Sequence, residues 1–398
     1  MAESGSQHVV IVGGGSAGIS VAARLLRGSG APRVTVIDPS ATHDYQPLWT
    51  LVGGGVLPKE EARRAESDVM PAGAEWVKDS VTAFDPAART VHTAGGGTVR
   101  YDVLVVAAGL QLDWHKVKGL AGHVGRDGIC SNYSFETVDS TWKAIRSFTG
   151  GDAVFTQPST PIKCGGAPQK IMYLADDAFR RQGVRDRSRI HFWSGTASIF
   201  AVEKYATALK GVLARKGITD THFRSDLVEV RPASREAVFR NLDTAQEFVQ
   251  RYDMLHVTPP MSAPDFIKSS PLAGPAGWVE VDQFTCRHVR HPDVFALGDC
   301  ANLPTSKTGA AIRKQAPVVA ANVLATLRGT EPAERYDGYT SCPLVTGYGS
   351  LILAEFDYSG KPAETFPFDQ SKERWSMYQL KRHVLPRLYW SGMLKGRA

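Results

Sequence analysis

The chain has 398 residues and a formal net charge of +6, with 43% hydrophobic and 22% charged residues. A chain of this length is expected to form two or three domains. The mild positive excess attracts anions in general, but the sequence has no zinc-finger spacing, RNA-binding aromatic signature or long Lys/Arg run, so nucleic acid is not a predicted partner. The odd number of cysteines, five, argues against a secreted disulfide scaffold, and no metal ligands are predicted.

The start of the chain, residues 1–7, is polar and leads directly into an apolar strand, so we expect no signal peptide. No run of about 18 apolar residues occurs, so no transmembrane helix is expected. The sequence therefore predicts a protein that is either soluble or bound to a membrane surface.

The first predicted unit is a βαβ fold with a dinucleotide-binding turn. A strand at 8–12 is followed by GGGSAG at 13–18, a helical pattern at 19–27 and a strand at 34–37 that ends at Asp38. This is the G-x-G-x-x-G arrangement with an acidic residue about 20 positions beyond its last glycine. The sequence therefore predicts a dinucleotide site.

Each residue of this turn has a predicted role. Gly13 permits a tight turn, and Gly15 lets the backbone approach a pyrophosphate closely. Gly18 lets the helix pack closely on the strand. The amides near Ser16 and Ala17 point along the helix dipole toward the phosphate. Asp38 is placed to accept hydrogen bonds from ribose hydroxyls.

Two later segments favour FAD over NAD as the bound dinucleotide. A buried strand at 101–108 precedes Gly109, and the segment 291–302 (HPDVFALGDCAN) ends a strand in Gly298-Asp299, ahead of a predicted helix from Thr308 to Leu324. Both segments resemble fingerprints of flavoproteins with two dinucleotide-binding domains. The predicted cofactor contacts outside the first turn are Gln46, Val81, Ala108, Gly109, Gly298, Asp299, Lys307, Thr308 and Gly309.

The second βαβ unit is predicted to lack a nicotinamide site. A strand at 152–156, a helix at 169–182 and a strand at 189–193 form the frame, but a proline-containing loop at 157–168 replaces the phosphate turn. Prolines remove N–H donors and stiffen the turn, and no acid follows the second strand. Electrons are therefore expected to come from another donor.

The loop that replaces the phosphate turn contains a cysteine. Cys164 lies just before the predicted helix, with Lys163 beside it, and both features favour a thiolate. Cys342 lies in a segment predicted to be rich in turns, 339–347. Spacing alone does not show that the two cysteines meet. The others, Cys130, Cys286 and Cys300, are interpreted as buried apolar residues, with a role for Cys130 or Cys300 left open.

Several segments resemble the sulfide:quinone oxidoreductases, most closely their mitochondrial-type branch and its bacterial relatives. The resemblance covers nearly the whole chain and is strongest in the segments 161–174, 254–261, 298–308, 336–347 and 354–377. It implies FAD as cofactor and a redox disulfide between Cys164 and Cys342. Glu136 stands where some branches have a third cysteine, so a two-cysteine mechanism is implied.

The resemblance also implies a reaction. Sulfide attacks the disulfide, Cys342 keeps the added sulfur as a persulfide, and Cys164 is released as the thiolate that reduces the flavin. A small thiol or sulfite then takes the sulfur, and the electrons pass to a membrane quinone, ubiquinone being the expected one. Lys163 and Lys307 are candidates for attracting the anionic substrate, or are solvated surface residues.

The last segment, 370–398, is basic and aromatic and predicts an amphipathic helical tail. Four apolar residues follow helical spacing, with four aromatic rings and several cations around them, and Pro386 is expected to divide the tail into two short helices. We expect a peripheral anchor on a membrane surface, expected to be the bacterial cytoplasmic membrane. The alternative is a helix packed on its own domain or on a second subunit. The apolar residues are Met377, Leu380, Val384 and Leu388, and the rings are Trp375, Tyr378, Tyr389 and Trp390. Candidate aromatic residues of the quinone site are Phe356, Tyr358, Phe366 and Phe368.

The predicted fold is α/β, with two Rossmann-like βαβ domains and the helical tail. The FAD domain is expected to be discontinuous, at 1–118 and 285–338, with the second domain at 119–284 and the cysteine-containing tail at 339–398. Three other functions stay open: a single-subunit NADH:quinone oxidoreductase, a sulfide dehydrogenase that reduces a cytochrome, and a flavin redox sensor without turnover.

Overall fold

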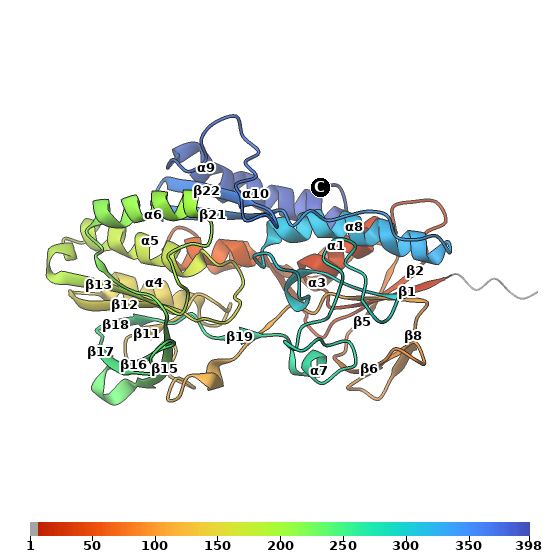
Figure 1. Ribbon diagram of the computed structural model, residues 1–398, viewed down its shortest axis with the longest axis horizontal. Coiled ribbons are helices and arrows are strands. Elements are labelled where there is room, and N and C mark those ends of the chain that lie inside the picture. Colours follow the sequence, from red (N-terminus) through yellow and green to blue (C-terminus); the bar gives the residue numbers. More distant parts are fainter. Residues whose placement is uncertain (1–6) are drawn as a thin grey trace, which may run out of the picture.

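Two five-stranded parallel sheets organise the computed structural model, which describes residues 7–398 (Figure 1). The predicted polar start falls almost entirely on residues 1–6, which lie outside the described residues. The first sheet has the order β20-β9-β1-β2-β5. Its strands are β1 (His8–Val12), β2 (Arg33–Ile37), β5 (Ala74–Val77), β9 (Val103–Val106) and β20 (Val294–Ala296).

The second sheet has the order β11-β18-β12-β13-β14. Its strands are β11 (Ile129–Cys130), β12 (Gly151–Gln157), β13 (Ser188–Ser194), β14 (Asp220–His222) and β18 (Met254–His256). β12 and β13 flank the helix α5 in sequence, so the predicted second βαβ frame is present. The predicted α/β fold class is therefore confirmed.

Helices lie on one side of the second sheet, and a small antiparallel ribbon covers its other side (Figure 1). Parallel strands are buried on both faces, which explains why β1 and β9 are continuous apolar runs with exposures of 3% or less in Val9–Val12 and Val103–Val106. The helices ahead of the tail are α1 (Ser16–Leu25), α2 (Trp49–Gly53), α3 (Glu66–Val69), α4 (Val138–Ser147), α5 (Ala167–Arg181), α6 (Glu203–Lys216), α7 (Asp265–Lys268) and α8 (Gly309–Leu327).

Small antiparallel elements complete the two halves. Hairpins and ribbons form from β3 (Thr42–Asp44) with β4 (Arg63–Ala65), β6 (Val81–Asp85) with β7 (Thr90–Thr93) and β8 (Thr98–Arg100), β10 (Gln111–Leu112) with β19 (Met261–Ser262), and β15 (Ser225–Arg231) with β16 (Glu236–Asn241) and β17 (Glu247–Arg251).

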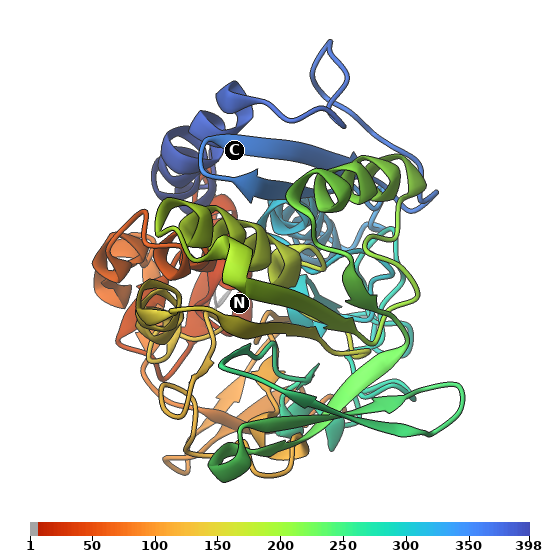
Figure 2. The same cartoon turned by 90° about the vertical axis from the view of Figure 1, so that its left-hand side faces the viewer.

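A C-terminal hairpin, β21 (Thr340–Gly347) and β22 (Ser350–Phe356), lies across α5 and α8 (Figure 2). Cys342 is in β21, opposite Ala354, so the prediction of a turn-rich segment there was wrong. The strand forms because its β-prone residues pair with β22 along almost their whole length. Pro343 is tolerated because each strand of a two-stranded ribbon has one edge that forms no ladder bonds.

The tail is one continuous helical path rather than two helices. It comprises α9 (Trp375–Gln379), a π-helical stretch Leu380–Val384, α10 (Leu385–Arg387) and a second π-helical stretch Leu388–Gly392. Leu385 and Leu388 both keep right-handed helical angles beside Pro386, so the predicted break was wrong. The widened turns avoid the clash that proline makes with the carbonyl of the preceding turn.

Candidate active site

The structure brings Cys164 and Cys342 together, with their sulfur atoms 3.9 Å apart. Cys164 lies in the loop before α5 and adopts a left-handed backbone (φ +59°), held by its N–H donating to the Lys307 carbonyl at 2.8 Å. Cys342 is fully buried on β21. The contact depends on β21 packing against α5, which joins two distant parts of the chain.

A lysine from the first part of α5 contacts this pair. The Lys170 ammonium lies 3.1 Å from the Cys164 sulfur, and Lys170 is itself buried. The prediction that Lys163 stabilises the Cys164 thiolate was wrong, because its ammonium does not contact the sulfur. Its ammonium donates instead to the Gln46 side chain at 2.8 Å and to the Tyr133 carbonyl at 2.9 Å.

The two thiols have opposite proton affinities. The Cys342 thiol donates toward the Cys164 sulfur and holds the pKa of Cys164 well below its ordinary value, an effect that Lys170 strengthens and burial opposes. The same contact, together with burial, raises the pKa of Cys342 well above its ordinary value. Cys164 is therefore the thiolate of the pair and Cys342 the protonated thiol.

Three further lysines near the site are largely withdrawn from solvent. Burial lowers the pKa of Lys163 to about 8 and that of Lys381 to about 7. Lys381, in the basic tail, donates to the Pro47 carbonyl at 2.9 Å. Lys307 donates to the carbonyls of Asp299 and Ala301. None of the three is a freely solvated surface residue.

A cavity of about 380 Å³ opens beside Cys164 and extends to the C-terminal helix. Seven of the predicted site residues line it: Ser16, Gln46, Cys164, Asp299, Lys307, Thr308 and Gly309. Cys342 lies directly behind Cys164. Val81 begins β6, is buried, and is not among the lining residues.

The glycine turn at the N-terminus of α1 fits a dinucleotide. A Cβ added at Gly13 would lie 2.5 Å from the Ala107 carbonyl oxygen, and one at Gly18 would lie 1.9 Å from the Gly13 carbonyl oxygen. A Cβ at Gly15 would meet nothing within 4 Å, so the turn is open where a phosphate approaches. Ala17 is buried in the first turn of α1.

Asp38 braces this turn as well as ending β2. Its carboxylate accepts the Gly14 N–H at 2.6 Å and the Ser40 N–H at 2.7 Å. A carboxylate has about four acceptor sites, so capacity for ribose hydroxyls is left. Nearby, the buried Glu66 Oε1 has no hydrogen-bond partner among residues 7–398.

The remaining predicted cofactor positions lie around the same edge of the first sheet. Ala108 and Gly109 directly follow β9, and a Cβ at Gly109 would meet no atom within 4 Å. Gly298 follows β20 with φ +72°, and its N–H donates to the Gln315 side chain at 2.9 Å. Thr308 caps α8 by accepting the Ala311 N–H at 3.1 Å.

Sequence reasoning missed the contribution of the C-terminal helix to this site. The Tyr389 hydroxyl is hydrogen-bonded to the Ser16 hydroxyl at 2.6 Å and to His43 Nε2 at 2.5 Å, and its ring lies 4.3 Å from that of Tyr45. His43 in turn contacts Glu66 at 3.2 Å. No local signal in the sequence links position 389 to the turn at position 16.

The turn of the second βαβ unit is filled by the protein itself. Ser159 donates from both its N–H and its hydroxyl to Asp226, at 2.7 and 2.5 Å. A Cβ at Gly195 would lie 2.3 Å from the Ser159 nitrogen. The space next to β12 and β13 therefore leaves no open glycine cradle for a second pyrophosphate.

Comparisons with known proteins agree with this geometry. The sequence profile of the family described as "Pyridine nucleotide-disulphide oxidoreductase" matches residues 7–140. Mitochondrial sulfide:quinone oxidoreductase of Mus musculus is 48% identical over 98% of this chain and 86% of that protein. The Schizosaccharomyces pombe protein of the same name is 38% identical over 98% and 91%.

Solved structures show the same fold at lower identity. The sulfide:quinone oxidoreductase of Aquifex aeolicus superposes with a TM-score of 0.82 at 18% identity, covering 98% of this chain and 92% of that chain. A chain in the mitochondrial ATP synthase structure of Tetrahymena thermophila gives 0.87 at 20% identity, covering 100% and 98%.

Paired Rossmann-like sheets, an open dinucleotide turn and adjacent thiols define a flavin-linked disulfide oxidoreductase. Within that class, the chain belongs to the sulfide:quinone oxidoreductase family. The prediction of FAD as the cofactor is confirmed, because the matched families are FAD-binding flavoproteins.

Proposed function

We propose that this chain oxidises sulfide at the Cys164–Cys342 pair and passes the electrons through FAD to a quinone. The observation behind this proposal is the 3.9 Å contact between a thiolate-forming Cys164 and Cys342 at the wall of a cavity that begins at the dinucleotide turn. The filled turn of the second βαβ unit argues against NADH as the electron donor.

The chain's own residues account for the sulfur chemistry. In the oxidised pair, a hydrosulfide anion attacks the Cys342 sulfur, the bond between the cysteines breaks, and Cys164 leaves as a thiolate. Lys170 stabilises the leaving thiolate, so departure of Cys164 is favoured. The sulfur on Cys342 then passes to a small thiol or sulfite. Bound FAD supplies a two-electron acceptor beside Cys164.

Two anaerobic measurements test this function. Sulfide should bleach the flavin absorbance of the holoenzyme, and addition of a soluble ubiquinone should restore it. NADH at the same concentration should leave the absorbance unchanged. Rapid bleaching by NADH but not by sulfide would contradict the proposal and favour the NADH:quinone alternative.

The apolar end of the cavity is the proposed quinone site. Its wall there consists of Leu353, Phe366, Leu380, Leu385, Leu388 and Met393. Of the four aromatic candidates, only Phe366 lines the cavity. Phe356 packs on Phe200, the Tyr358 hydroxyl donates to the Gln283 carbonyl, and Phe368 stacks on Phe366 from outside the lining.

Phe366→Ala is expected to raise the KM for quinone about tenfold, because loss of one aromatic contact corresponds to roughly 1.4 kcal/mol. Sulfide should still bleach the flavin at the wild-type rate, since Phe366 does not contact either cysteine. Steady-state turnover and anaerobic bleaching measured on one preparation separate the two effects. Phe248→Ala, at an exposed aromatic residue of β17 that does not line the cavity, serves as the control and should leave both values unchanged.

We also propose that the exposed face of the tail binds a membrane surface. Trp375 is 68% exposed and Val384 51% exposed, whereas Tyr389 and Trp390 are buried against the FAD domain. The buried face fits the alternative of a helix packed on its own domain, and the exposed face is the one proposed to bind the membrane. Within the described chain, no helix is long and apolar enough to cross a bilayer. The membrane and its face, bacterial cytoplasmic or other, stay predictions.

The double variant Trp375→Ser with Val384→Ser should bind vesicles containing anionic lipid at least tenfold more weakly than wild type. Burying these two side chains in the interface supplies roughly 3 kcal/mol, and both are lost. Vesicle co-sedimentation gives the partition. Val249→Ser, also 54% exposed but on β17, is the matched control and should bind as wild type. Equal binding of the double variant would contradict the assignment of this face.

A further inference from the structure

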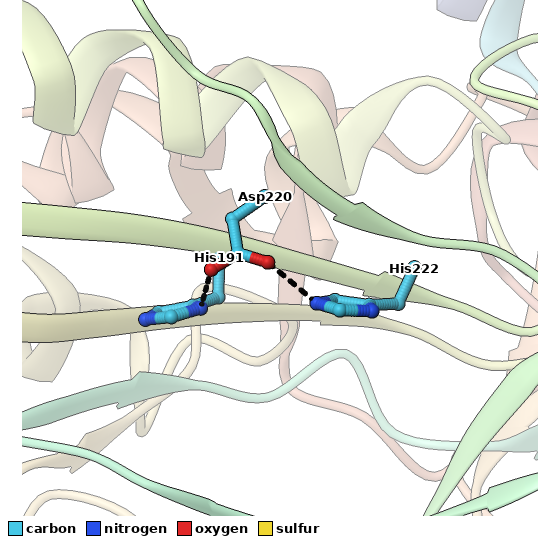
Figure 3. Close-up of side chains that lie close together, drawn as sticks. All are labelled: His191, Asp220 and His222. Carbon is cyan, nitrogen blue, oxygen red and sulfur yellow. Dashed lines mark hydrogen bonds and ion pairs between the residues drawn. The ribbon is translucent and has the colours of Figure 1, made fainter.

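A cluster of three metal-ligand side chains lies on the second sheet, outside the cysteine cavity (Figure 3). His191 comes from β13, and Asp220 and His222 come from β14. The parallel register pairs His191 with Asp220 and Trp193 with His222, which places the three polar side chains together. The pairing of β13 with β14 brings His191 next to Asp220 and His222, so no sequence motif predicts the cluster.

Asp220 lies between the two imidazoles (Figure 3). Its Oδ2 is 2.6 Å from His191 Nδ1, and its Oδ1 is 2.7 Å from His222 Nε2. One ligand atom from each residue lies within 4.8 Å of the others. The His222 ring stacks on Trp193 with centroids 3.8 Å apart, which holds its Nε2 toward Asp220.

His191 lies between two carboxylates. Its Nε2 is 2.8 Å from Asp152 Oδ1, and its Nδ1 is 2.6 Å from Asp220 Oδ2. The contact with Asp152 orients the ring so that Nδ1 faces Asp220.

The His191 side chain is only 5% exposed, and its Nδ1 has no properly aligned hydrogen-bond partner among the described residues. A tetrahedral metal ion bound along the lone-pair direction of His191 Nδ1 holds its other ligands to the side of that direction. The Asp220 oxygen, which is close to Nδ1 but not aligned with it, lies in such a place. The Asp152 carboxylate behind the ring is the partner that metal-bound histidines commonly have.

We propose that His191, Asp220 and His222 bind a divalent ion of the zinc type. Two imidazole nitrogens and one carboxylate oxygen, with a water in the fourth position, suit Zn²⁺. Ligand atoms around tetrahedral zinc lie roughly 3.3 Å apart, so the 2.6 and 2.7 Å contacts must open by about 0.6 to 0.7 Å. Asp220 and His222 can make this adjustment, since their side chains are 41% and 38% exposed.

Titration of the holoenzyme with Zn²⁺, measured by calorimetry, tests the site. Because the Cys164 thiolate would also bind zinc, it is first alkylated with iodoacetamide; Cys342 is fully buried and protonated. One ion per chain is expected to bind. Asp220→Asn and His222→Ala should each weaken binding at least tenfold, and Asp152→Asn should weaken it by about 10- to 100-fold.

The chain provides a matched control in His123, whose Nδ1 lies 2.9 Å from the Asp127 carboxylate on the surface without a second histidine. His123→Ala should bind Zn²⁺ as wild type does. Flavin absorbance and melting temperature before zinc addition report that each variant is folded. Absence of saturable binding to folded wild-type protein, or unchanged affinity in Asp220→Asn, would overturn the proposal.

Discussion

Replacing Cys164 with serine is expected to slow reduction of the flavin by sulfide on the order of 10³-fold or more, as loss of a nucleophile does. A serine hydroxyl cannot form the bond to Cys342 that sulfide must break. It also cannot supply the thiolate that contacts Lys170 at 3.1 Å. Anaerobic stopped-flow mixing with sulfide, followed at the flavin absorbance band, measures the rate.

Cys286→Ala is the matched control, because Cys286 is another fully buried cysteine but has no contact with the pair. It should bleach at close to the wild-type rate. Cys342→Ser should lose the reaction as Cys164→Ser does, since both sulfurs are needed for the disulfide. If Cys164→Ser bleached as fast as wild type, sulfide would have to reduce the flavin directly, and the cysteine mechanism would be wrong.

The glycine turn could be predicted from the sequence because its requirements are local. Gly13 and Gly18 each pack so closely on a neighbouring carbonyl that no side chain fits, and Gly15 faces open space. These demands depend on a strand, a turn and a helix that follow one another in the chain. The predicted strand at 8–12 accordingly agrees with β1, and the predicted helical pattern at 19–27 overlaps α1, which begins three residues earlier at Ser16.

The cysteine pair is a different case, because it depends on tertiary packing. Cys164 and Cys342 meet only because β21 crosses α5, and family resemblance rather than spacing implied the contact. The lysine was misassigned for a related reason. Lys163 is adjacent in sequence but points toward Gln46, whereas the helical path of α5 returns Lys170 to the sulfur.

The tail shows how regular periodicity fails when a helix is not a regular α-helix. Helical spacing predicted one apolar face for the tail, and Tyr389 and Trp390 were expected among the rings of a membrane anchor. Two π-helical stretches add a residue to a turn and rotate the face that follows. As a result Tyr389 and Trp390 are buried, and Tyr389 reaches the Ser16 hydroxyl.

Lys170→Met is expected to move the acid limb of the sulfide reaction to higher pH. In the wild-type protein the Cys342 thiol and the Lys170 ammonium hold the pKa of Cys164 well below its ordinary value, so its sulfur stays ionised at lower pH than an ordinary thiol. Without the ammonium, less opposes the effect of burial, and the pKa of Cys164 rises. The variant should therefore lose about 10- to 100-fold in bleaching rate on the acid limb and recover as the pH rises, because a neighbouring charge shifts a pKa by about one to two units.

Lys170→Arg tests whether charge is the cause, since guanidinium retains the positive charge at every pH used. Its profile should lie closer to wild type than that of Lys170→Met. A Lys170→Met profile that fell uniformly at all pH values would indicate damaged packing around α5 instead. A profile that matched wild type would show that the Cys342 thiol alone holds Cys164 ionised. Direct alkylation of Cys164 by iodoacetamide across the same pH range gives its ionisation independently of sulfide and quinone, and should show the same order of variants.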